Sequence, residues 1–202
     1  ADEPEAVAHF SGQMKREAAR LATLVQEIID LSRLQEPDAL VNPELVAVDD
    51  VVDEALGRVR VGADSHGIAL VRGGETGLRV YGDQALLTTA VRNLLDNAIR
   101  YSPGGQRVSV GVKAANGMVR IAVVDQGMGI PEEVQSRVFE RFYRVDEARS
   151  RATGGTGLGL SIVKHIAADH GGEVTLWSKE GRGSTFTLVI PQVTRAPEAE
   201  EA

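Results

Sequence analysis

The sequence of 202 residues contains no cysteine, which excludes disulfides, thiolate nucleophiles and cysteine metal sites. Its four histidines do not follow a metal-ligand spacing such as H-E-x-x-H. No apolar run approaches the roughly 20 residues of a membrane-spanning helix. The net charge is −7 and no basic face stands out, which argues against binding to nucleic acid. These absences favour a protein suited to a reducing cytoplasm, with enough apolar residues for one buried core.

Residues 8–35 have the pattern of one long helix. Its apolar residues follow the alternating three- and four-residue spacing of a heptad seam: Phe10, Met14, Leu21, Leu24, Ile28 and Leu31. Further apolar neighbours widen this stripe, which favours a helical bundle. The alternative is a helix packed on its own globular domain. Because prolines bracket a break, we expect a helical segment over 1–36 and a linker over 37–43.

Residues 44–191 alternate between short strands and helices. The first strand is expected at 44–48, and Asp49 or Asp50 should cap a helix that runs to about 62. Asp83 can cap the next helix, and Asn116-Gly117 is a good hairpin turn. Further elements are expected as strands at 68–71, 78–81, 108–114, 118–125, 173–178 and 184–190, and as a helix at 158–168.

The strands come mainly as hairpins and not as strand–helix–strand repeats. We therefore expect an α/β (α+β) sandwich, with helices on one face of a mixed, mostly antiparallel sheet and one long helix before it. Residues 144–157 are polar and lack apolar periodicity, and long loops of this kind are often lids. The acidic, Ala/Pro-rich residues 192–202 predict a disordered tail.

The stretch from Asn93 to Asn97 puts two amide side chains on one helical face, because residues four apart are neighbours on a helix. An amide oxygen suits Mg²⁺ that keeps water and phosphate oxygens as its other ligands. The simpler interpretation is that both asparagines are exposed on the polar face. Arg100, one turn further, can pair with phosphate, and Tyr101 offers a ring at the same end.

A second motif, Asp125-Gln-Gly127-Met-Gly129, follows an alternating strand. A carboxylate fixed at a strand end can accept a hydrogen bond from an amino group such as adenine N6. Glycines let the backbone turn sharply and approach a ligand closely. The simpler interpretation is a turn with a solvated aspartate.

A third motif is the glycine-rich stretch from Gly154 to Ser161. It has the spacing of a P-loop, but Leu160 stands where the P-loop has its essential lysine. It is not G-x-G-x-x-G and follows a polar loop, so a Rossmann site is disfavoured. Backbone N–H groups at the start of the helix from Leu158 can instead meet phosphate oxygens. Together the three motifs indicate a nucleotide–magnesium site.

The chain resembles the catalytic ATP-binding domain of bacterial sensor histidine kinases in the motifs NLLDNAIRYS, DQGMGI, FERFYR, GGTGLGLSIVKHIAADHGG and GRGSTF. These motifs occur in order over roughly residues 44–190, which makes the resemblance specific. The superfamily also includes type II topoisomerases, mismatch-repair ATPases and heat-shock chaperone ATPases. The preceding stretch LVQEIIDLSRLQ resembles the second helix of the dimerisation and phosphotransfer domain. Together with ARSRATGGTGLGL, it looks most like actinobacterial phosphate-responsive sensor kinases.

The resemblance implies ATP and Mg²⁺ as cofactors. It makes Asn97 the chief Mg²⁺ ligand, with Asn93 beside it as a ligand and a catalytic residue. At that position the related ATPases have a glutamate that activates water, so an amide suits a phosphotransferase. Arg141, Lys164 or neighbouring basic groups would reach the γ-phosphate, with Arg141 and Lys164 as further catalytic residues.

Nucleotide contacts are also implied. Asp125 would bind adenine N6, Thr185 would back the adenine pocket, and Phe142 would help Phe139 to anchor the lid. The full set implied to bind the nucleotide, besides the two asparagines, is Arg100, Tyr101, Asp125, Gly127, Gly129, Ile130, Phe142, Gly155, Thr156, Gly157, Leu158, Gly159, Leu160 and Thr185.

The chain departs from the family in one respect: the H-E-x-[RK]-T-P motif that carries the phosphorylated histidine is absent. His9 lies in a different sequence context, and His165 and His170 are expected to be structural or surface groups. The resemblance therefore implies a piece of a longer kinase, with the acceptor histidine and membrane spans upstream. It implies a cytoplasmic domain of a membrane-anchored homodimer, whose partner is a response-regulator receiver domain.

Two other functions stay open. An ATPase or a serine protein kinase of the same superfamily would turn over ATP steadily, although the amide at Asn93 argues against hydrolysis. A non-enzymatic dimerisation module would instead use the apolar seam over 10–31, because an exposed apolar stripe drives association.

Overall fold

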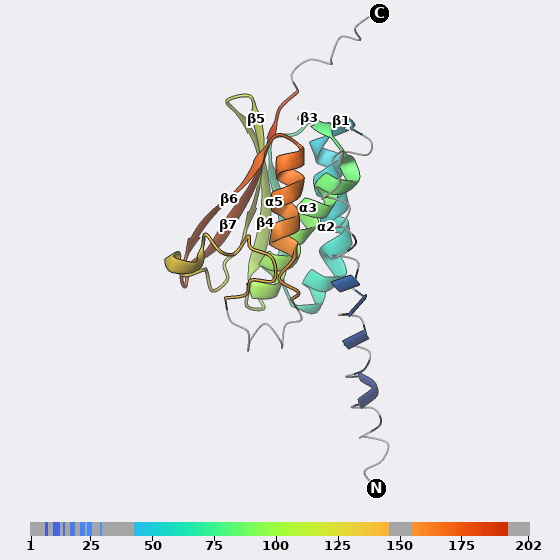
Figure 1. Cartoon of the computed structure of the whole chain (residues 1–202), viewed down its shortest axis with the longest axis vertical. Helices are drawn as coiled ribbons and strands as arrows, with labels where there is room; N and C mark the ends of the chain where they lie inside the picture. The colour runs from blue at the N-terminus through green and yellow to red at the C-terminus, as the bar shows by residue number, and fades with distance from the viewer. Residues whose placement is uncertain are drawn as a thin grey trace, which may run out of the picture.

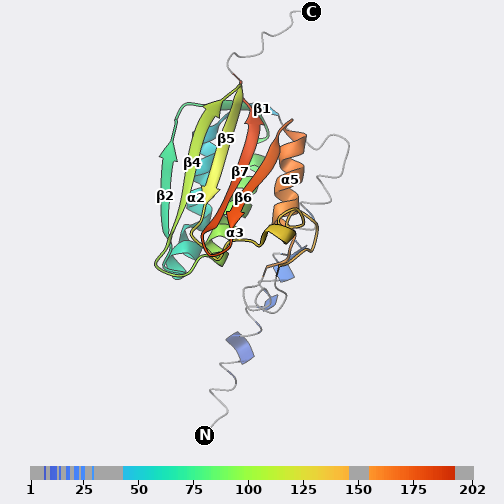
Figure 2. The same cartoon turned by 90° about the vertical axis from the view of Figure 1, so that its left-hand side faces the viewer.

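The computed structural model describes residues 43–145 and 155–193, together with part of the positions between 7 and 29. One five-stranded sheet has the order β2-β4-β5-β7-β6, and three helices cover one of its faces (Figure 1). Figure 2 shows the sheet from its opposite face, with the helices behind it. The strands are β2 (Ala69–Gly74), β4 (Arg107–Ala115), β5 (Met118–Val124), β6 (Glu173–Lys179) and β7 (Gly183–Pro191), and the helices are α2 (Val48–Ser65), α3 (Gln84–Tyr101) and α5 (Gly159–Asp169).

Strand pairing in this sheet is mixed. β2 runs parallel to β4, and the other neighbouring pairs are antiparallel. The expected α/β sandwich with a mostly antiparallel sheet is therefore confirmed. A 3-10 turn, η1 (Glu132–Val134), follows Pro131 between β5 and α5.

The core lies between the helices and the sheet. Alternate residues of the central strands point towards the helices because successive side chains of a strand face opposite ways. Helix α3 meets them with apolar residues at three- and four-residue spacing. The fully buried side chains from these elements include Val108, Val110, Val119, Val123, Leu188, Ile190, Leu87, Val91, Leu94 and Leu95.

A separate antiparallel pair, β1 (Glu44–Ala47) and β3 (Arg79–Gly82), lies at the N-terminal end of α2. Beyond β7, Gln192 bridges to Val80, and the Val193 N–H donates to the Arg79 carbonyl at 3.0 Å. The expected disordered tail therefore does not begin at 192, because these contacts hold Gln192 and Val193 against β3. Residues 194–202 lie outside the described residues, so their disorder stays a prediction.

The two predicted helix caps have different outcomes. Asp83 Oδ1 accepts a hydrogen bond from the Leu86 N–H at 3.0 Å, which confirms the cap of α3. The predicted cap of α2 is wrong, because this helix begins at Val48, directly after β1, with no side-chain cap. Asp49 instead pairs with Arg72, so its carboxylate joins the helix to β2.

The hairpin between β4 and β5 has the predicted turn. Asn116 has φ of 54° and Gly117 has φ of 71°. Positive φ at both central residues is the geometry of a type I′ turn, whose twist matches that of the flanking strands. This turn fixes the register of β5 and hence the position of Asp125, the residue that follows it.

His170 has the structural role that the sequence predicted. It is 6% exposed, and its Nε2 accepts from the Asp83 N–H at 3.0 Å. Its Nδ1 lies 2.7 Å from the Ile166 carbonyl oxygen, which can only accept. The ring is therefore neutral with its proton on Nδ1, and it joins the end of α5 to the start of α3.

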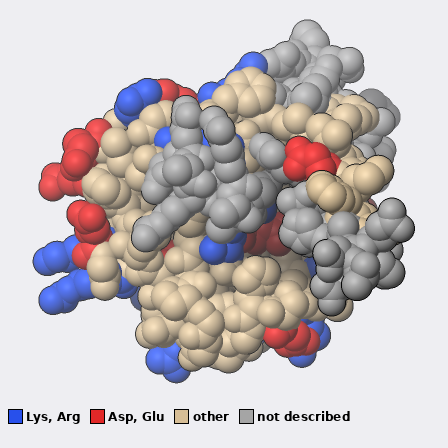
Figure 3. Space-filling view, turned by 90° about the horizontal axis from the view of Figure 1, so that it is seen from below, with Lys and Arg blue, Asp and Glu red and all other residues tan. Residues whose placement is uncertain are grey.

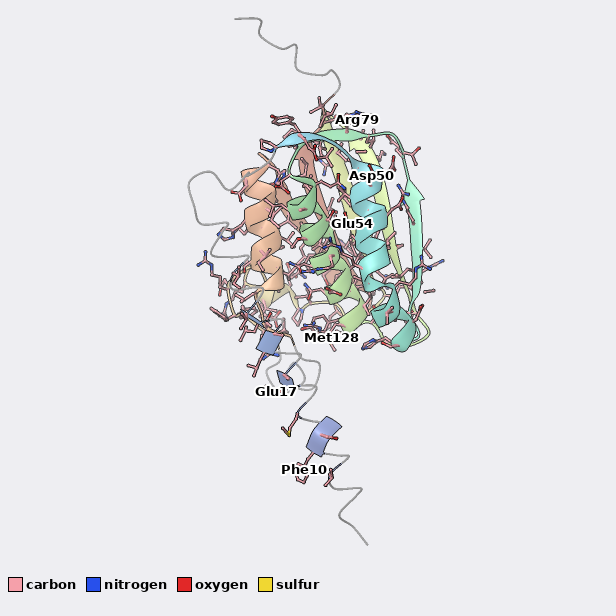
Figure 4. The ribbon with its side chains drawn as sticks, turned by 90° about the vertical axis from the view of Figure 1, so that its right-hand side faces the viewer. Phe10, Glu17, Asp50, Glu54, Arg79 and Met128 are labelled. Carbon is pink, nitrogen blue, oxygen red and sulfur yellow. The ribbon has the colours of Figure 1, made fainter. Side chains whose placement is uncertain are left out.

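The described positions between 7 and 29 are helical, as predicted. Phe10 and Met14 are largely exposed, whereas Leu24 is half-buried and packs against the core. Figure 4 shows Phe10 far along this segment and Glu17 nearer the sheet domain. Leu21 is also exposed, whereas Ile28, Leu31 and the linker at 37–42 lie outside the described residues. Over the part of the chain that the structure describes, no helix is both long and apolar enough to cross a bilayer.

Candidate functional site

A cavity of about 950 Å³ opens beside the last turns of α3. It is bounded by the loop after β5, the start of β7 and the glycine-rich residues before α5. Figure 3 shows a recess on this side of the molecule, with both acidic and basic atoms visible within it. The volume suits a ligand of nucleotide size. Expected residues that line the cavity are Asn93, Asn97, Arg100, Tyr101, Asp125, Gly127, Gly129, Ile130, Gly155, Thr156, Gly157, Gly159 and Leu160.

The two asparagines lie on the wall that α3 provides. Asn93 is 6% exposed, so the simpler interpretation of two solvent-exposed amides does not hold for it. Its Nδ2 donates to the Gly159 carbonyl at 3.4 Å, which leaves Oδ1 as the atom that can accept or ligate. Asn97 is half-buried one turn further along the helix.

Amide oxygens of this kind fit a Mg²⁺ ion whose coordination is completed by phosphate and water. Within the described residues, no group of three or more histidine or carboxylate side chains could hold a metal ion. The two asparagine side chains are the groups on this wall whose chemistry fits a cation bound together with phosphate.

Asp125 is 7% exposed and lies directly after β5. Its Oδ1 accepts from the Gly127 N–H at 2.8 Å and from the Ser184 N–H at 3.2 Å. Burial raises the pKa of Asp125, while hydrogen bonds from Gly127 and Ser184 act in the opposite direction. Its second oxygen remains the acceptor that a ligand amino group could use.

The loop that follows Asp125 packs closely against the end of β6. Gly129 has φ of 70°, and a Cβ at this position would overlap the Lys179 carbonyl. The Gly181 N–H donates to the Met128 carbonyl at 2.7 Å. In Figure 4, Met128 and Glu17 lie towards the same end of the sheet domain. Glycine at 129 is thus required by both backbone conformation and close approach.

Guanidinium groups gather at the glycine-rich loop. A Cβ at Gly155 would lie 2.5 Å from Arg100 Nη1 and 3.9 Å from Arg144 Nη2. Both arginines line the cavity. Nε and Nη2 of Arg144 are buried and have no hydrogen-bond partner among the described residues. Two positive groups, of which Arg144 has unused donors, favour an anionic ligand at this part of the cavity.

Three side chains of the expected site lie elsewhere in the fold. Arg141 Nη2 lies 3.2 Å from His165 Nε2, outside the cavity. Lys164 is exposed on α5 and does not line the cavity. Leu158 is fully buried in the core, where it packs as an ordinary apolar residue. None of the three lines the cavity, and the roles that the resemblance implies for them stay predictions.

Phe142 and Thr185 do not line the cavity either. Phe142 is 62% exposed with φ of 62°, and it lines a second hollow of about 270 Å³ together with Leu21 and Leu24. Thr185 lies on the sheet face opposite to that of its neighbour Ser184, because consecutive strand residues alternate. Only Ser184 lines the cavity.

Several functional candidates were not predicted. Ser184 donates to Asp125, and Arg144 brings a second guanidinium. Phe186 lines the cavity and meets Phe139 edge to face, with ring centroids 6.2 Å apart. Strand alternation could have identified Ser184, since it shares its face with Phe186. Arg144 follows no regular element, so periodicity gives no signal for it.

This combination of fold and cavity defines a nucleotide-binding domain, and a comparison with known families gives its class. Residues 82–194 match the family described as "Histidine kinase-, DNA gyrase B-, and HSP90-like ATPase". The match covers more than half of the chain, so the chain belongs to this family of ATP-binding domains.

Among its relatives is the sensor-like histidine kinase SenX3 of Mycolicibacterium smegmatis, which is 53% identical over 95% of this chain and 50% of the relative. The solved structure of the mycobacterial sensor histidine kinase MprB is 34% identical, with a TM-score of 0.66 over 75% of this chain and 98% of that one. ShkA in complex with AMPPNP is 25% identical, with a TM-score of 0.77 over 97% of this chain and 40% of that one.

These comparisons confirm the resemblance to sensor histidine kinases of the actinobacterial type. The chain spans about half the length of the SenX3 relative that it matches.

Proposed function

We propose that the chain is the catalytic part of a sensor histidine kinase, which binds ATP with Mg²⁺ and transfers the γ-phosphoryl group to a histidine outside this chain. The observation that carries this proposal is one cavity with a buried carboxylate, Asp125, and with amides and guanidinium groups along its other walls. In the whole protein, a membrane-anchored homodimer would supply the acceptor histidine. A response-regulator receiver domain would then take the phosphoryl group.

Asp125 would recognise the base. Two backbone N–H groups occupy its Oδ1, so Oδ2 is the oxygen left for a ligand. The N6 amino group of adenine can donate to it, whereas guanine would bring a carbonyl oxygen against a carboxylate. The site is therefore expected to discriminate through an unfavourable contact as well as through a favourable one.

Asn93, Asn97 and the glycine-rich loop would hold the phosphates. Mg²⁺, when bound, would neutralise charge on the phosphate oxygens. The two amides would orient the cation from the α3 wall, and backbone N–H groups at the start of α5 would donate to phosphate oxygens. Arg100 and Arg144 would contribute charge from the other side of Gly155.

We assign the main contact with the terminal phosphate to Arg144, in place of Arg141 or Lys164. Arg144 lines the cavity with two buried nitrogen donors that no described residue accepts from. A phosphate oxygen would satisfy these donors, which removes the cost of leaving them unpaired. In the transfer, the acceptor imidazole nitrogen forms the new P–N bond, the bond to the β-phosphate oxygen breaks, and ADP leaves.

ATP hydrolysis is the competing function. Besides Asp125, the only carboxylate among the described residues that line the cavity is Asp96, which lies 4.0 Å from Arg92. If Asp96 activated water, the chain alone would turn over ATP steadily, and Asp96→Asn would abolish the turnover. The amide at Asn93 favours phosphotransfer, because no carboxylate stands at that position.

The proposal is tested by calorimetric titration of the chain with ATP or ADP, with and without Mg²⁺. We expect saturable binding that Asp125→Asn weakens and that Asp64→Asn, a change at an exposed aspartate, leaves unaltered. A second assay mixes the chain with a separately made histidine-bearing phosphotransfer helix and follows acid-labile phosphate. Absence of nucleotide binding by the unmodified chain would refute the proposal. Binding without transfer would reduce it to a nucleotide-binding function.

A further inference from the structure

Ser178, at the end of β6, connects two parts of the site without lining the cavity. Its Oγ accepts from the Ile130 N–H at 2.8 Å and donates to the Gly183 carbonyl at 3.1 Å. The same oxygen lies 3.0 Å from Ser184 Oγ. Ser178 therefore joins the far end of the loop after Asp125 to the residue that donates to Asp125.

The directions of these hydrogen bonds follow from the donors available. Ser178 has one hydroxyl hydrogen, which it donates to the Gly183 carbonyl. The Ser184 hydroxyl therefore donates to Ser178 Oγ, which also accepts from the Ile130 N–H. The Ser184 N–H in turn donates to Asp125 Oδ1. Ser178 Oγ is thus the shared acceptor for the far end of the Asp125 loop and for the residue whose backbone holds the carboxylate.

Gln135 closes this arrangement from the other side. Its Nε2 donates to the Ile130 carbonyl at 2.9 Å and to the Ser178 carbonyl at 3.1 Å. Both hydrogens of the amide are thereby used, and the two hydrogen bonds together join the loop to β6. The backbone of Ile130 is consequently held through both its N–H and its carbonyl.

A purely structural role is the plain alternative. A hydroxyl at the end of a hairpin often satisfies nearby backbone groups without influence on function. That role accounts for the bond to Gly183, since both residues belong to the β6–β7 hairpin. It does not account for the contact with Ile130, which connects the hairpin to the far end of the Asp125 loop.

We infer that Ser178 is a positioning residue for adenine recognition, which holds the Asp125 carboxylate and its loop in the geometry that accepts an exocyclic amino group. This inference rests on the proposed function. It adds a determinant of base specificity that does not itself touch the ligand. Its loss removes the acceptor that the Ile130 N–H and the Ser184 hydroxyl share.

The test compares ADP with inosine diphosphate, which carries an oxygen in place of the amino group at position 6 of the purine. Both ligands present the same ribose and phosphates, so their affinity ratio isolates recognition of that position. For Ser178→Ala in the full chain, we expect ADP binding to weaken by about 5- to 30-fold. Inosine diphosphate should change by less than about twofold, so the preference for ADP should collapse.

Two further variants make the outcome specific. Ser178→Thr keeps the hydroxyl and, unlike Ser178→Ala, should retain the preference for ADP. Ser109→Ala is the matched control, because Ser109 is also half-buried on the same sheet and should leave both affinities unchanged. Circular dichroism checks folding. If Ser178→Ala does not fold, Gln135→Ala removes the other tie to the loop and should reduce the same ratio.

An unchanged ratio in Ser178→Ala would overturn the inference, and so would an equal loss of both ligands, since that result marks a role in the fold alone. Failure of the unmodified chain to bind ADP would refute the proposed function and the inference with it. Selective loss of ADP binding with rescue by Ser178→Thr would support both.

Discussion

Asp125→Asn should weaken nucleotide binding while leaving the free protein at least as stable. For binding, the substitution replaces an ionised acceptor with an amide whose nitrogen faces the incoming N6 amino group. Hydrogen bonds to charged groups contribute about 1.5–3 kcal/mol, which corresponds to roughly 10- to 150-fold in affinity for ADP. The amide oxygen can keep the bonds from Gly127 and Ser184, so the loop should retain its conformation.

For stability, the argument follows from the direction of the pKa shift. Burial raises the pKa of Asp125 above the unfolded value, so the folded state binds more protons in the window between the two pKa values. Stability therefore falls as the pH rises through that window, and the cost of the buried charge is fully present above the folded pKa. Asparagine has no charge to bury. We expect the variant to be equally or more stable at pH 7.5, with a flatter dependence of stability on acidic pH.

Calorimetry with ADP and urea unfolding at several pH values between 4 and 8 measure the two effects separately. Unaltered ADP affinity would show that Asp125 does not contact the base. A loss of more than about 1 kcal/mol of stability at pH 7.5 would show that its hydrogen bonds outweigh its desolvation, which contradicts the direction assigned here. Weaker binding together with preserved stability is the combination that the structure predicts.

Three further predictions concern the metal side, the loop and the core. Asn97→Ala should reduce the gain in ATP affinity that Mg²⁺ provides by at least about tenfold, without altering ADP binding in EDTA, as measured by calorimetry. Gly129→Ala should destabilise the domain by about 1–3 kcal/mol in urea unfolding, and by more than Gly117→Ala, which shares a positive φ but has open space around it. His170→Ala should cost about 2–3 kcal/mol in the same assay, because it leaves the Asp83 N–H unpaired and removes a buried ring, whereas His66→Ala, at an exposed histidine, should cost less than about 1 kcal/mol.

The sequence predicted the parts of the fold that local chemistry determines. The Asn116-Gly117 turn and the Asp83 cap each depend on one or two residues with a strong conformational preference, and both formed as expected. The α2 cap failed because Asp49 had a competing partner, Arg72, that is 23 positions away in the sequence. Capping rules contain only local terms, so a distant ion pair is invisible to them.

Within the site, the residues on α3 could be placed from the sequence, but the choice between neighbouring arginines of a loop could not. The α3 wall followed from helical spacing, since Asn93 and Asn97 share a face with Arg100. The choice of Arg141 over Arg144 could not be made in the same way, because residues 135–145 form neither a long helix nor a strand. Which arginine of that segment enters the cavity depends on tertiary contacts alone.

Base recognition shows how a rule present in the sequence can still be misapplied. β7 buries Phe186, Leu188 and Ile190 against the helices, so its period of two assigns Ser184 to that face and Thr185 to the open one. The motif draws attention to both hydroxyls, but only the alternation distinguishes them. Ser178 has the same parity on β6 as the half-buried Leu176, which brings its hydroxyl to the Ser184 side of the hairpin. The proposed specificity for adenine therefore depends on strand register, and a one-residue slip between β6 and β7 would separate Ser178 from Ser184 without changing any residue that lines the cavity.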